Sequence, residues 1–255
     1  MSYSPYASLA EIYETIRPSY PAELIADIIQ ITGLSSNVHC MEIGAGTGKA
    51  TEAFLQRDFY VDAIELDGSM AEILRRKCSS QKLKLCVGSF ETWTPPRAEY
   101  DMIYCAQAFH WLDPETKFKK CRHYLSTGGY LALIWYDPQL APNTPAQRAA
   151  EQIKNRYFGP SNMTTSVPMD QRTSELETAE GFMLHFQKQY SVTLQNTPKQ
   201  SLLAMQSTPA FSEKFRQLSS MQQDTFIKEY TLAIEENGGT LDAPMLYSLY
   251  ILKAV

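Results

Sequence analysis

Residues 41–51, MEIGAGTGKAT, carry three glycines at alternate positions, Gly44, Gly46 and Gly48. An apolar run precedes the glycines and a helical pattern over residues 49–57 follows them, which predicts a buried strand that turns sharply into a helix. Glycine at such a turn allows positive φ angles and leaves no side chain between the main chain and a ligand. The unpaired N–H groups of the helix N-terminus would face the same turn, so the stretch predicts a ligand site there.

The spacing of the glycines separates this turn from a dinucleotide-binding loop. In G-x-G-x-x-G the third glycine comes five residues after the first, whereas here the interval is four, and Glu42 precedes the first glycine by two residues. The pattern E-x-G-x-G-x-G resembles motif I of the class I S-adenosylmethionine-dependent methyltransferases. The alternative is an ordinary tight turn between a strand and a helix.

A second apolar strand, residues 60–65, ends in Glu65, about 21 residues after Gly44. In a nucleotide-binding βαβ unit an acid at about this distance accepts hydrogen bonds from ribose hydroxyls. A carboxylate suits a vicinal diol because it offers two acceptor oxygens. Glu65 is therefore a candidate ribose ligand, and the alternative is that Glu65 or Asp67 is a solvated loop acid.

The helix after the second strand is expected to begin at Ser69, because Ser69 and Glu72 have the spacing of a capping box. The methyltransferase resemblance places Leu66 and Met70 in the cofactor site, since a bulky apolar residue near this position packs on the adenine in the family. Met70 on the first turn of a helix is equally compatible with the core.

A third strand is predicted over residues 83–87, followed by a glycine and Ser89. The family usually has an acid directly after this glycine, near the adenine amino group, and Ser89 departs from that pattern. The resemblance then implies that the adenine is bound by Ser89 and the backbone around Phe90, or by Glu91.

A fourth apolar strand, residues 100–106, runs into the sequence QAFHWLD. Ligands of doubly wound sheets bind beyond the carboxyl ends of the strands. The stretch AQAFHWLD resembles the corresponding segment of the trans-aconitate methyltransferase-like small-molecule group. That resemblance implies cofactor contacts from Ala106 and Gln107, and acceptor contacts from Gln107, His110 and Trp111.

His110 is the candidate catalytic residue. Its ordinary pKa, near 6.5, suits a general base that takes a proton from an acceptor O–H or N–H. The alternative is a histidine whose nitrogens fix the loop or which packs beside the cofactor.

The N-terminal segment contains helical stretches over residues 8–16 and 22–31, separated by the breaker RPSYP. The segment from Tyr13 to Arg17 resembles the lead-in of the same group. The resemblance implies that Tyr13 lies over the cofactor and that Arg17 binds its carboxylate. The alternative for Arg17 is a surface cation before a turn.

The expected fold is α/β: a Rossmann-like seven-stranded methyltransferase sheet, mostly parallel with an antiparallel last strand, helices on both faces and a helical lid. Residues 1–136 are expected to hold the N-terminal helices and the S-adenosylmethionine-binding core, residues 137–180 a proline-rich lid, and residues 181–255 the edge strands and helices of the same domain. The latter part predicts strands over 182–194 and 244–254, and helices beginning at Thr197 and Ser212.

Composition limits the alternatives. The formal net charge of −5 and a pI near 5.5 give no broad basic surface for a nucleic acid. The N-terminus lacks the pattern of a signal peptide and no apolar run approaches a membrane span. The five cysteines form no C-x-x-C pair, which indicates reduced thiols in a cytoplasm-like compartment and no metal site. A cytoplasmic monomer or homodimer is expected.

The resemblance implies a methyltransferase of class EC 2.1.1 that uses S-adenosylmethionine and releases S-adenosylhomocysteine. By resemblance to its group, the acceptor is a small molecule methylated on oxygen or nitrogen, with a carboxylic acid as one possibility. Three alternatives stay open: an NAD-dependent oxidoreductase, an RNA or protein methyltransferase, and a cofactor-binding protein without transfer activity.

Overall fold

The computed structural model describes residues 10–160 and 169–255. Over these residues the strands form one sheet in the order β3-β2-β1-β4-β5-β7-β6. The first five strands run parallel, and β7 is antiparallel to both of its neighbours. The expected methyltransferase fold, with an antiparallel last strand, is therefore confirmed. The strands are β1 His39–Ile43, β2 Tyr60–Glu65, β3 Leu83–Val87, β4 Tyr100–Ala106, β5 Leu125–Pro138, β6 Phe182–Asn196 and β7 Leu241–Ala254.

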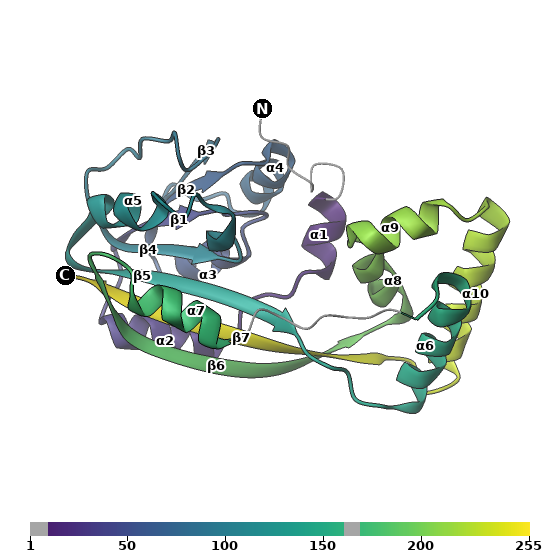
Figure 1. Ribbon diagram of the computed structural model, residues 1–255. Helices are drawn as coiled ribbons and strands as arrows, with labels where there is room; N and C mark the ends of the chain where they lie inside the picture. Colours follow the sequence, from purple (N-terminus) through teal and green to yellow (C-terminus); the bar gives the residue numbers. More distant parts are fainter. Residues whose placement is uncertain (1–9, 161–168) are drawn as a thin grey trace.

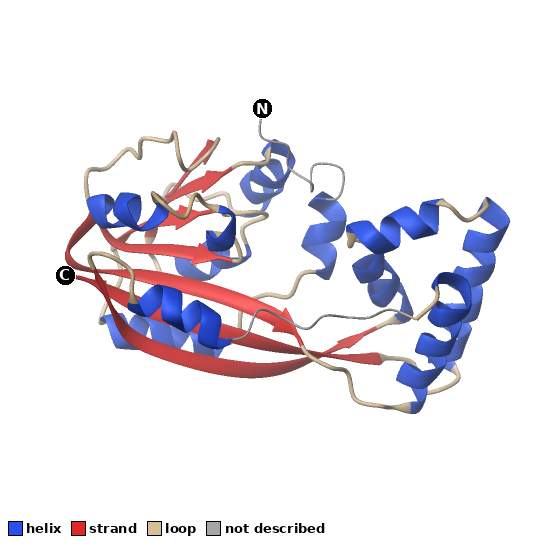
Figure 2. Cartoon of the chain, in the orientation of Figure 1, coloured by secondary structure: helices blue, strands red, loops and turns tan. Residues whose placement is uncertain are grey.

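Helices cover both faces of the sheet (Figures 1 and 2). Helices α2, α3 and α4 pack on one face, and η1, α5 and α7 pack on the other. Successive residues of a strand point to opposite faces, so Met41 joins the second layer while its neighbour Cys40 joins the first. The helices are α1 Ala10–Ile16, α2 Ala22–Thr32, α3 Lys49–Leu55, α4 Gly68–Lys77, η1 Phe109–Trp111, α5 Lys117–Tyr124, α6 Pro145–Phe158, α7 Met169–Glu177, α8 Pro198–Gln206, α9 Pro209–Arg216 and α10 Ser220–Glu235.

Helices α6, α8, α9 and α10 form a separate helical unit with its own core. The unit lies at the far ends of the long strands β5, β6 and β7, beyond the carboxyl end of β5 (Figure 1). Phe226 of α10 is fully buried in it and lies against the rings of Tyr157 and Phe158, with centroids 5.2 and 5.0 Å away. The expected lid segment is thus divided in space, because α6 belongs to this unit whereas α7 packs on the sheet. Its role as a lid stays a prediction.

Two predicted helix starts are wrong. Helix α4 begins at Gly68 rather than Ser69, because the Asp67 carboxylate accepts the backbone N–H groups of Ser69 and Met70 and so takes the capping position. The helix expected from Ser212 is two helices, α9 and α10. Ser219 begins the second of these with a capping box, in which its side chain accepts the N–H of Gln222.

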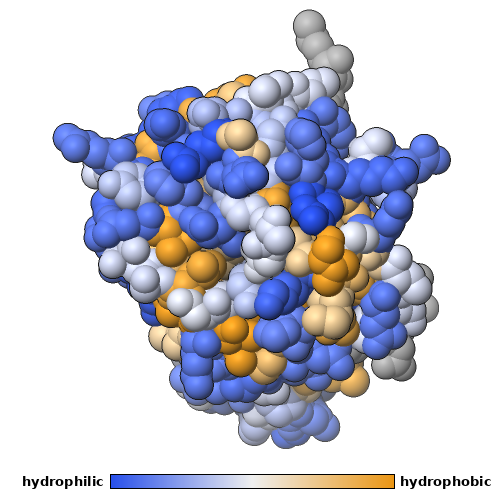
Figure 3. Space-filling view, turned by 90° about the vertical axis from the view of Figure 1, so that its left-hand side faces the viewer, coloured by the Kyte–Doolittle hydropathy of each residue, from blue (hydrophilic) through white to orange (hydrophobic). Residues whose placement is uncertain are grey.

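The described residues were compared with the patterns of membrane spans and of metal sites. No helix within residues 10–160 and 169–255 combines the length and hydrophobicity of a membrane span. Among the same residues, no group of three or more His, Cys, Asp or Glu side chains is arranged to hold a metal ion. On the face that Figure 3 shows, hydrophobic residues lie in small groups between hydrophilic ones.

Candidate functional site

The three glycines of residues 44–48 all have positive φ angles, as the sequence predicts, but they meet different surroundings. A Cβ atom added to Gly44 would lie 2.3 Å from the Cβ of Ala108. One added to Gly48 would lie 2.3 Å from Cδ1 of Leu74. At Gly44 a side chain would therefore clash with the loop after β4, whatever ligand is bound. At Gly48 the clash would be with the end of the flexible Leu74 side chain, so the positive φ is the stronger requirement for glycine there.

Gly46 is the glycine with room for a ligand. The nearest atom to a Cβ built there is Sδ of Met70, 4.0 Å away. The backbone N–H of Gly46 donates to Oε2 of Glu65 at 2.7 Å, and the other carboxylate oxygen, Oε1, accepts the N–H of Asp67 at 2.8 Å. Glu65 thus lies beside the glycine turn, as the spacing predicts, and its carboxylate fixes the shape of that turn. Its ribose contact stays a prediction.

Glu42 lies behind the turn rather than in it. Its side chain is only 1% exposed, and Oε2 accepts hydrogen bonds from the Thr51 hydroxyl at 2.5 Å and the Tyr104 hydroxyl at 3.0 Å. Burial raises the pKa of Glu42 to about 8. Glu42 therefore ties β1 to α3 and β4, and in this conformation it acts on a ligand only through the turn that it supports.

Helix α1 brings Tyr13 and Arg17 to the same edge of the sheet. The Arg17 guanidinium lies 4.8 Å from the centroid of the Tyr13 ring and donates to the Tyr136 hydroxyl at 3.0 Å. Tyr136 is near the carboxyl end of β5. The two residues expected from the resemblance therefore lie together beside the carboxyl edge, and their contacts with a cofactor stay predictions.

The expected adenine-binding residues lie at the ends of β2 and β3. Leu66 is 43% exposed and offers apolar surface, whereas the Phe90 side chain is buried in the core. The Ser89 hydroxyl donates to the Glu91 carboxylate. The carbonyl of Phe90 accepts from Nζ of Lys120 at 2.5 Å. The Phe90 ring is thus unavailable to a ligand, whereas Leu66, Ser89 and Glu91 are accessible. Adenine contacts from these residues and from the backbone around Phe90 stay predictions.

Gln107 follows Ala106 at the end of β4 and has an unusual backbone conformation, with φ at +66°. Its N–H donates to the carbonyl of Ile134 at 2.9 Å, and its side-chain amide donates to the carbonyl of Tyr136 at 2.7 Å. A non-glycine residue adopts positive φ only when its surroundings hold it there. Gln107 therefore joins the ends of β4 and β5 in a fixed geometry.

Gln107 and His110 line a pocket of about 320 Å³ beside this edge. The volume lies near the lower end of the roughly 300–1,000 Å³ that small-molecule sites occupy. Trp111 is 70% exposed and does not line the pocket, so its acceptor contact stays a prediction. The lining residues are Gln107, Phe109, His110, Lys117, Trp135, Asp137, Arg172 and Glu175.

Nδ1 of His110 accepts a hydrogen bond from the indole N–H of Trp135, at 3.3 Å. A neutral imidazole that accepts at Nδ1 carries its proton on Nε2. Burial lowers the pKa of His110, and the positive charges of Arg172 and Lys117 lower it further. His110 is therefore neutral near pH 7 and presents an N–H donor. The general-base role of His110 stays a prediction. The hydrogen bond from Trp135 counts against it, because it occupies the nitrogen lone pair that a base would use.

Two ion pairs form the polar wall of the pocket. Lys117, 6% exposed, lies 2.5 Å from the Glu175 carboxylate, which is 49% exposed. Arg172 makes two hydrogen bonds to Asp137, at 2.6 and 3.1 Å. Sequence reasoning missed all four residues. Asp137 could have been found, because it follows the predicted fifth strand at the carboxyl edge, but the others come from α5 and α7 and carry no local signal.

A larger hollow, of about 580 Å³, lies away from this edge. It is lined by residues of α4, of the loop after it and of β3, among them Cys78, Ser80 and Leu83. Ligands of parallel sheets bind at the carboxyl ends of the strands, and Leu83 begins its strand. The glycine turn and the smaller pocket are therefore the candidate ligand site.

The residues at the carboxyl edge fit S-adenosylmethionine. Gly46 leaves backbone open to a ligand, Glu65 presents acceptor oxygens for a diol, and Leu66 supplies apolar surface for a base. At the other end, the Arg17 cation suits the amino-acid carboxylate. The base, the ribose and the amino-acid carboxylate of S-adenosylmethionine could therefore each meet a suitable group along this edge.

Comparison with known proteins identifies the family of this chain. Residues 41–133 match a family model described as a methyltransferase domain. An uncharacterized methyltransferase of Bacillus subtilis, YrrT, is 30% identical over 161 residues, which cover 60% of this chain and 74% of that protein. Trans-aconitate 2-methyltransferase of Delftia acidovorans is 26% identical over 136 residues, 52% of this chain and 48% of that protein.

The structural neighbours have the same fold. A methyltransferase from Thiobacillus denitrificans, solved with S-adenosylhomocysteine, superposes with a TM-score of 0.57 at 12% identity, and the match covers 100% of both chains. The chain spans about half the length, 51%, of the uncharacterized mycobacterial methyltransferases that it matches. The glycine turn, the sheet order and these relatives together show that the chain belongs to the class I S-adenosylmethionine-dependent methyltransferases.

Proposed function

We propose that the protein transfers the methyl group of S-adenosylmethionine to the carboxylate oxygen of a small organic acid. The cofactor lies along the edge from Leu66 to Arg17, and the acceptor occupies the pocket that Gln107 and His110 line. The product would be a methyl ester, released with S-adenosylhomocysteine.

The observation that carries the proposal is the buried ammonium of Lys117. Its side chain is 6% exposed, and its partner Glu175 is half exposed on α7. Lys117 is also held against aromatic rings, with Nζ 4.8 Å from the centroid of Phe109. The cation is thus fixed while its carboxylate partner can turn into solvent. An acceptor carboxylate can replace Glu175 without leaving a buried charge unpaired.

The remaining pocket residues would position such an acid. The Nε2–H of His110 donates to an acceptor oxygen, and Gln107 sets the distance between the pocket and the cofactor edge. A carboxylate is already ionised at neutral pH, so its methylation requires no protein base. When bound, S-adenosylmethionine supplies a methyl group made electrophilic by a positive sulfur. The protein then contributes alignment and exclusion of water, and alignment alone provides roughly 7–11 kcal/mol in favourable cases.

Other features support a small organic acid over the alternatives. The net charge of −5 disfavours a nucleic-acid substrate. The four-residue glycine interval disfavours NAD. A protein that binds the cofactor without transferring a methyl group would need no acceptor pocket beside Gln107. The relative from Delftia acidovorans is named for its action on trans-aconitate, which is an organic acid.

The test is a panel of acceptors with S-adenosylhomocysteine formation as the readout. Small mono-, di- and tricarboxylic acids should be turned over and should yield base-labile esters, while amines, phenols, RNA and protein should not. Lys117→Met should raise the KM for the acid at least tenfold, and Lys119→Met, an exposed lysine of the same helix, should change nothing. Turnover of amines alone, or equal effects of the two variants, would contradict the proposal.

The pH profile separates a donor from a base at His110. A base loses activity as the pH falls through its pKa, whereas the Nε2–H donor is present in both the neutral and the charged imidazole. Activity toward a carboxylate should therefore stay level down to the pKa of the acceptor. If activity falls at a higher pH than this, and the pH dependence disappears in His110→Gln, His110 acts as a base.

A further inference from the structure

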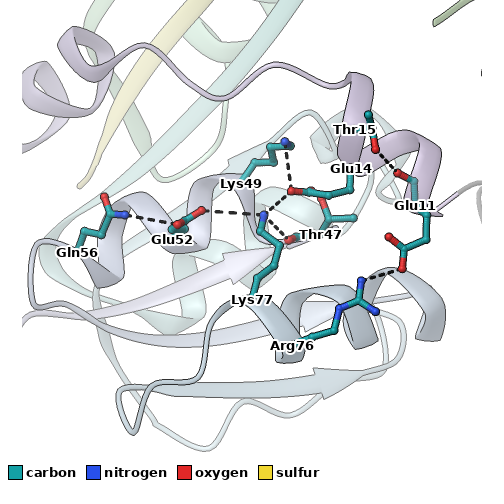
Figure 4. Close-up of polar contacts among 9 residues, drawn as sticks. All are labelled: Glu11, Glu14, Thr15, Thr47, Lys49, Glu52, Gln56, Arg76 and Lys77. Atoms are coloured by element: carbon teal, nitrogen blue, oxygen red, sulfur yellow. Dashed lines mark hydrogen bonds and ion pairs between the residues drawn. The ribbon is translucent and has the colours of Figure 1, made fainter. Parts of the chain in front are cut away.

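Helix α1 is joined to the segment that carries the glycine turn by one carboxylate and two ammonium groups (Figure 4). Oε1 of Glu14 lies 2.6 Å from Nζ of Lys77 and 3.4 Å from Nζ of Lys49. Lys49 is the first residue of α3, directly after the turn. Nζ of Lys77 also donates to the carbonyl of Thr47, within the turn, at 3.3 Å. The cluster thus connects α1 to the turn itself, to the start of α3 and, through Lys77, to the end of α4.

These contacts are better shielded from water than a typical surface ion pair. The side chains of Glu14, Lys49 and Lys77 are 21%, 18% and 26% exposed. Burial raises the pKa of Glu14, but the hydrogen bond from Lys77 and the nearby ammonium charges outweigh it, so the net pKa is below the ordinary value. Glu14 is therefore ionised at neutral pH and attracts both lysines.

A second ion pair of helix α1 is much more exposed to solvent. Glu11 lies 2.7 Å from Arg76, but the two side chains are 68% and 61% exposed. Solvent and salt screen such a pair strongly. Glu11 therefore provides a matched comparison, with the same charge, the same helix and a partner on the same helix α4.

Helix α1 lies beside the candidate cofactor site. Tyr13 of α1 packs with Met70 and Ile73 of α4, and Met70 is the side chain nearest to Gly46. At its other end, the segment after α1 reaches the carboxyl end of β5 through the bond from Arg17 to Tyr136. Helix α1 thus extends over the edge along which the cofactor would lie, and it also touches α8 of the helical unit.

We propose that α1 is a gate for the cofactor and that Glu14, with Lys49 and Lys77, is the latch that holds the gate closed. The proposal rests on the proposed cofactor site. The latch residues stabilise the closed position of α1 equally with and without the cofactor, because the carboxylate is directed at the two lysines. Weakening the latch should therefore speed entry and exit by the same factor and leave the Kd almost unchanged.

The experiment measures association and dissociation rates of S-adenosylhomocysteine by stopped-flow fluorescence. Glu14→Gln should raise both rates by roughly five- to tenfold, the factor expected for losing a partly buried charge pair, with a Kd within about twofold of the unaltered protein. Lys77→Met, which also removes the bond to the Thr47 carbonyl, should raise both rates by at least as much. The double variant should show less than the product of the two increases, because both changes remove the pair between Glu14 and Lys77. Glu11→Gln should leave both rates unchanged.

Each contrary result identifies a different failure. A faster dissociation with unchanged association, and so a weaker Kd, would make Glu14 part of the binding surface and overturn the latch. Unchanged rates in Glu14→Gln would overturn it as well. If Glu14→Gln unfolds, two other measurements test the latch. Lys49→Met should raise both rates, and added salt should raise both rates of the unaltered protein, because salt screens the ion pairs of the latch. If the unaltered protein binds neither S-adenosylmethionine nor S-adenosylhomocysteine, the proposed function fails first.

Discussion

Replacing Glu42 by Gln should change how the stability of the protein depends on pH. Glu42 is fully enclosed, and one of its oxygens accepts hydrogen bonds from Thr51 and Tyr104. The glutamine carbonyl can accept the same two hydrogen bonds, but the side chain cannot ionise. The variant should therefore keep the fold and lose the cost of burying a carboxylate.

The magnitude follows from the pKa of Glu42, which burial raises from 4.5 to about 8. Because the folded state has the higher pKa, the associated stability is complete below pH 4.5 and is lost as the pH rises through 8. At about 1.4 kcal/mol per pH unit, the loss is on the order of 5 kcal/mol. Glu42→Gln should not show this loss, so its advantage over the unaltered protein should grow between pH 5 and pH 9.

The assay is urea unfolding of both proteins at pH 5, 7 and 9, with m-values checked for equality. Glu72→Gln, which removes an exposed carboxylate of α4, serves as the control and should follow the unaltered protein at every pH. If the curves for Glu42→Gln and the unaltered protein stay parallel across this range, Glu42 is ionised in the folded state and the argument from burial is refuted.

Two further predictions concern the glycine turn. Glu65→Gln should weaken S-adenosylhomocysteine binding by about 1–3 kcal/mol, because the N–H of Gly46 loses a charged acceptor, and calorimetry that finds an unchanged Kd would remove Glu65 from the site. Gly44→Ala should destabilise the protein by at least about 1–2 kcal/mol from its positive φ alone, with the Cβ of Ala108 adding a clash. A thermal melting temperature within a degree of the unaltered protein would contradict the close packing of the two loops that follow β1 and β4.

The sheet was predictable because its determinants are local. Most residues of the first four strands are apolar, the glycine spacing follows β1 directly, and Glu65 ends β2. The helix starts at Ser69 and Ser212 were mispredicted because several polar residues compete as caps. Asp67 prevails because its carboxylate accepts two N–H groups of the first turn, and Ser219 prevails because it forms a reciprocal capping box with Gln222.

Only some residues of the proposed acceptor pocket could be predicted, because the others are brought to it by the folding of distant helices. Gln107 and His110 follow a predicted strand, so their place at the carboxyl edge could be expected. Lys117, Arg172 and Glu175 lie on helices whose contacts with that edge arise only when the chain folds. No periodicity or spacing indicates which charged residue of a helix will turn toward a pocket. The two ion pairs therefore emerged only from the structure.

A similar limit applies to the glycines. All three were expected to leave space for a ligand, yet at Gly44 and Gly48 protein atoms lie 2.3 Å from where a Cβ would be, namely the Cβ of Ala108 and the end of the Leu74 side chain. Sequence indicates that glycine is required at a turn. Only the packing shows whether a ligand or the protein itself occupies the space.

Calorimetric titration of the unaltered protein with S-adenosylmethionine, S-adenosylhomocysteine and NAD tests the central claim most directly. The arrangement of Gly46, Glu65 and Arg17 predicts saturable binding of the first two ligands, one per chain, and no heat of binding with NAD. Binding of NAD, or the absence of binding by both sulfur-containing ligands, would contradict the assignment of this edge as a methyl-donor site.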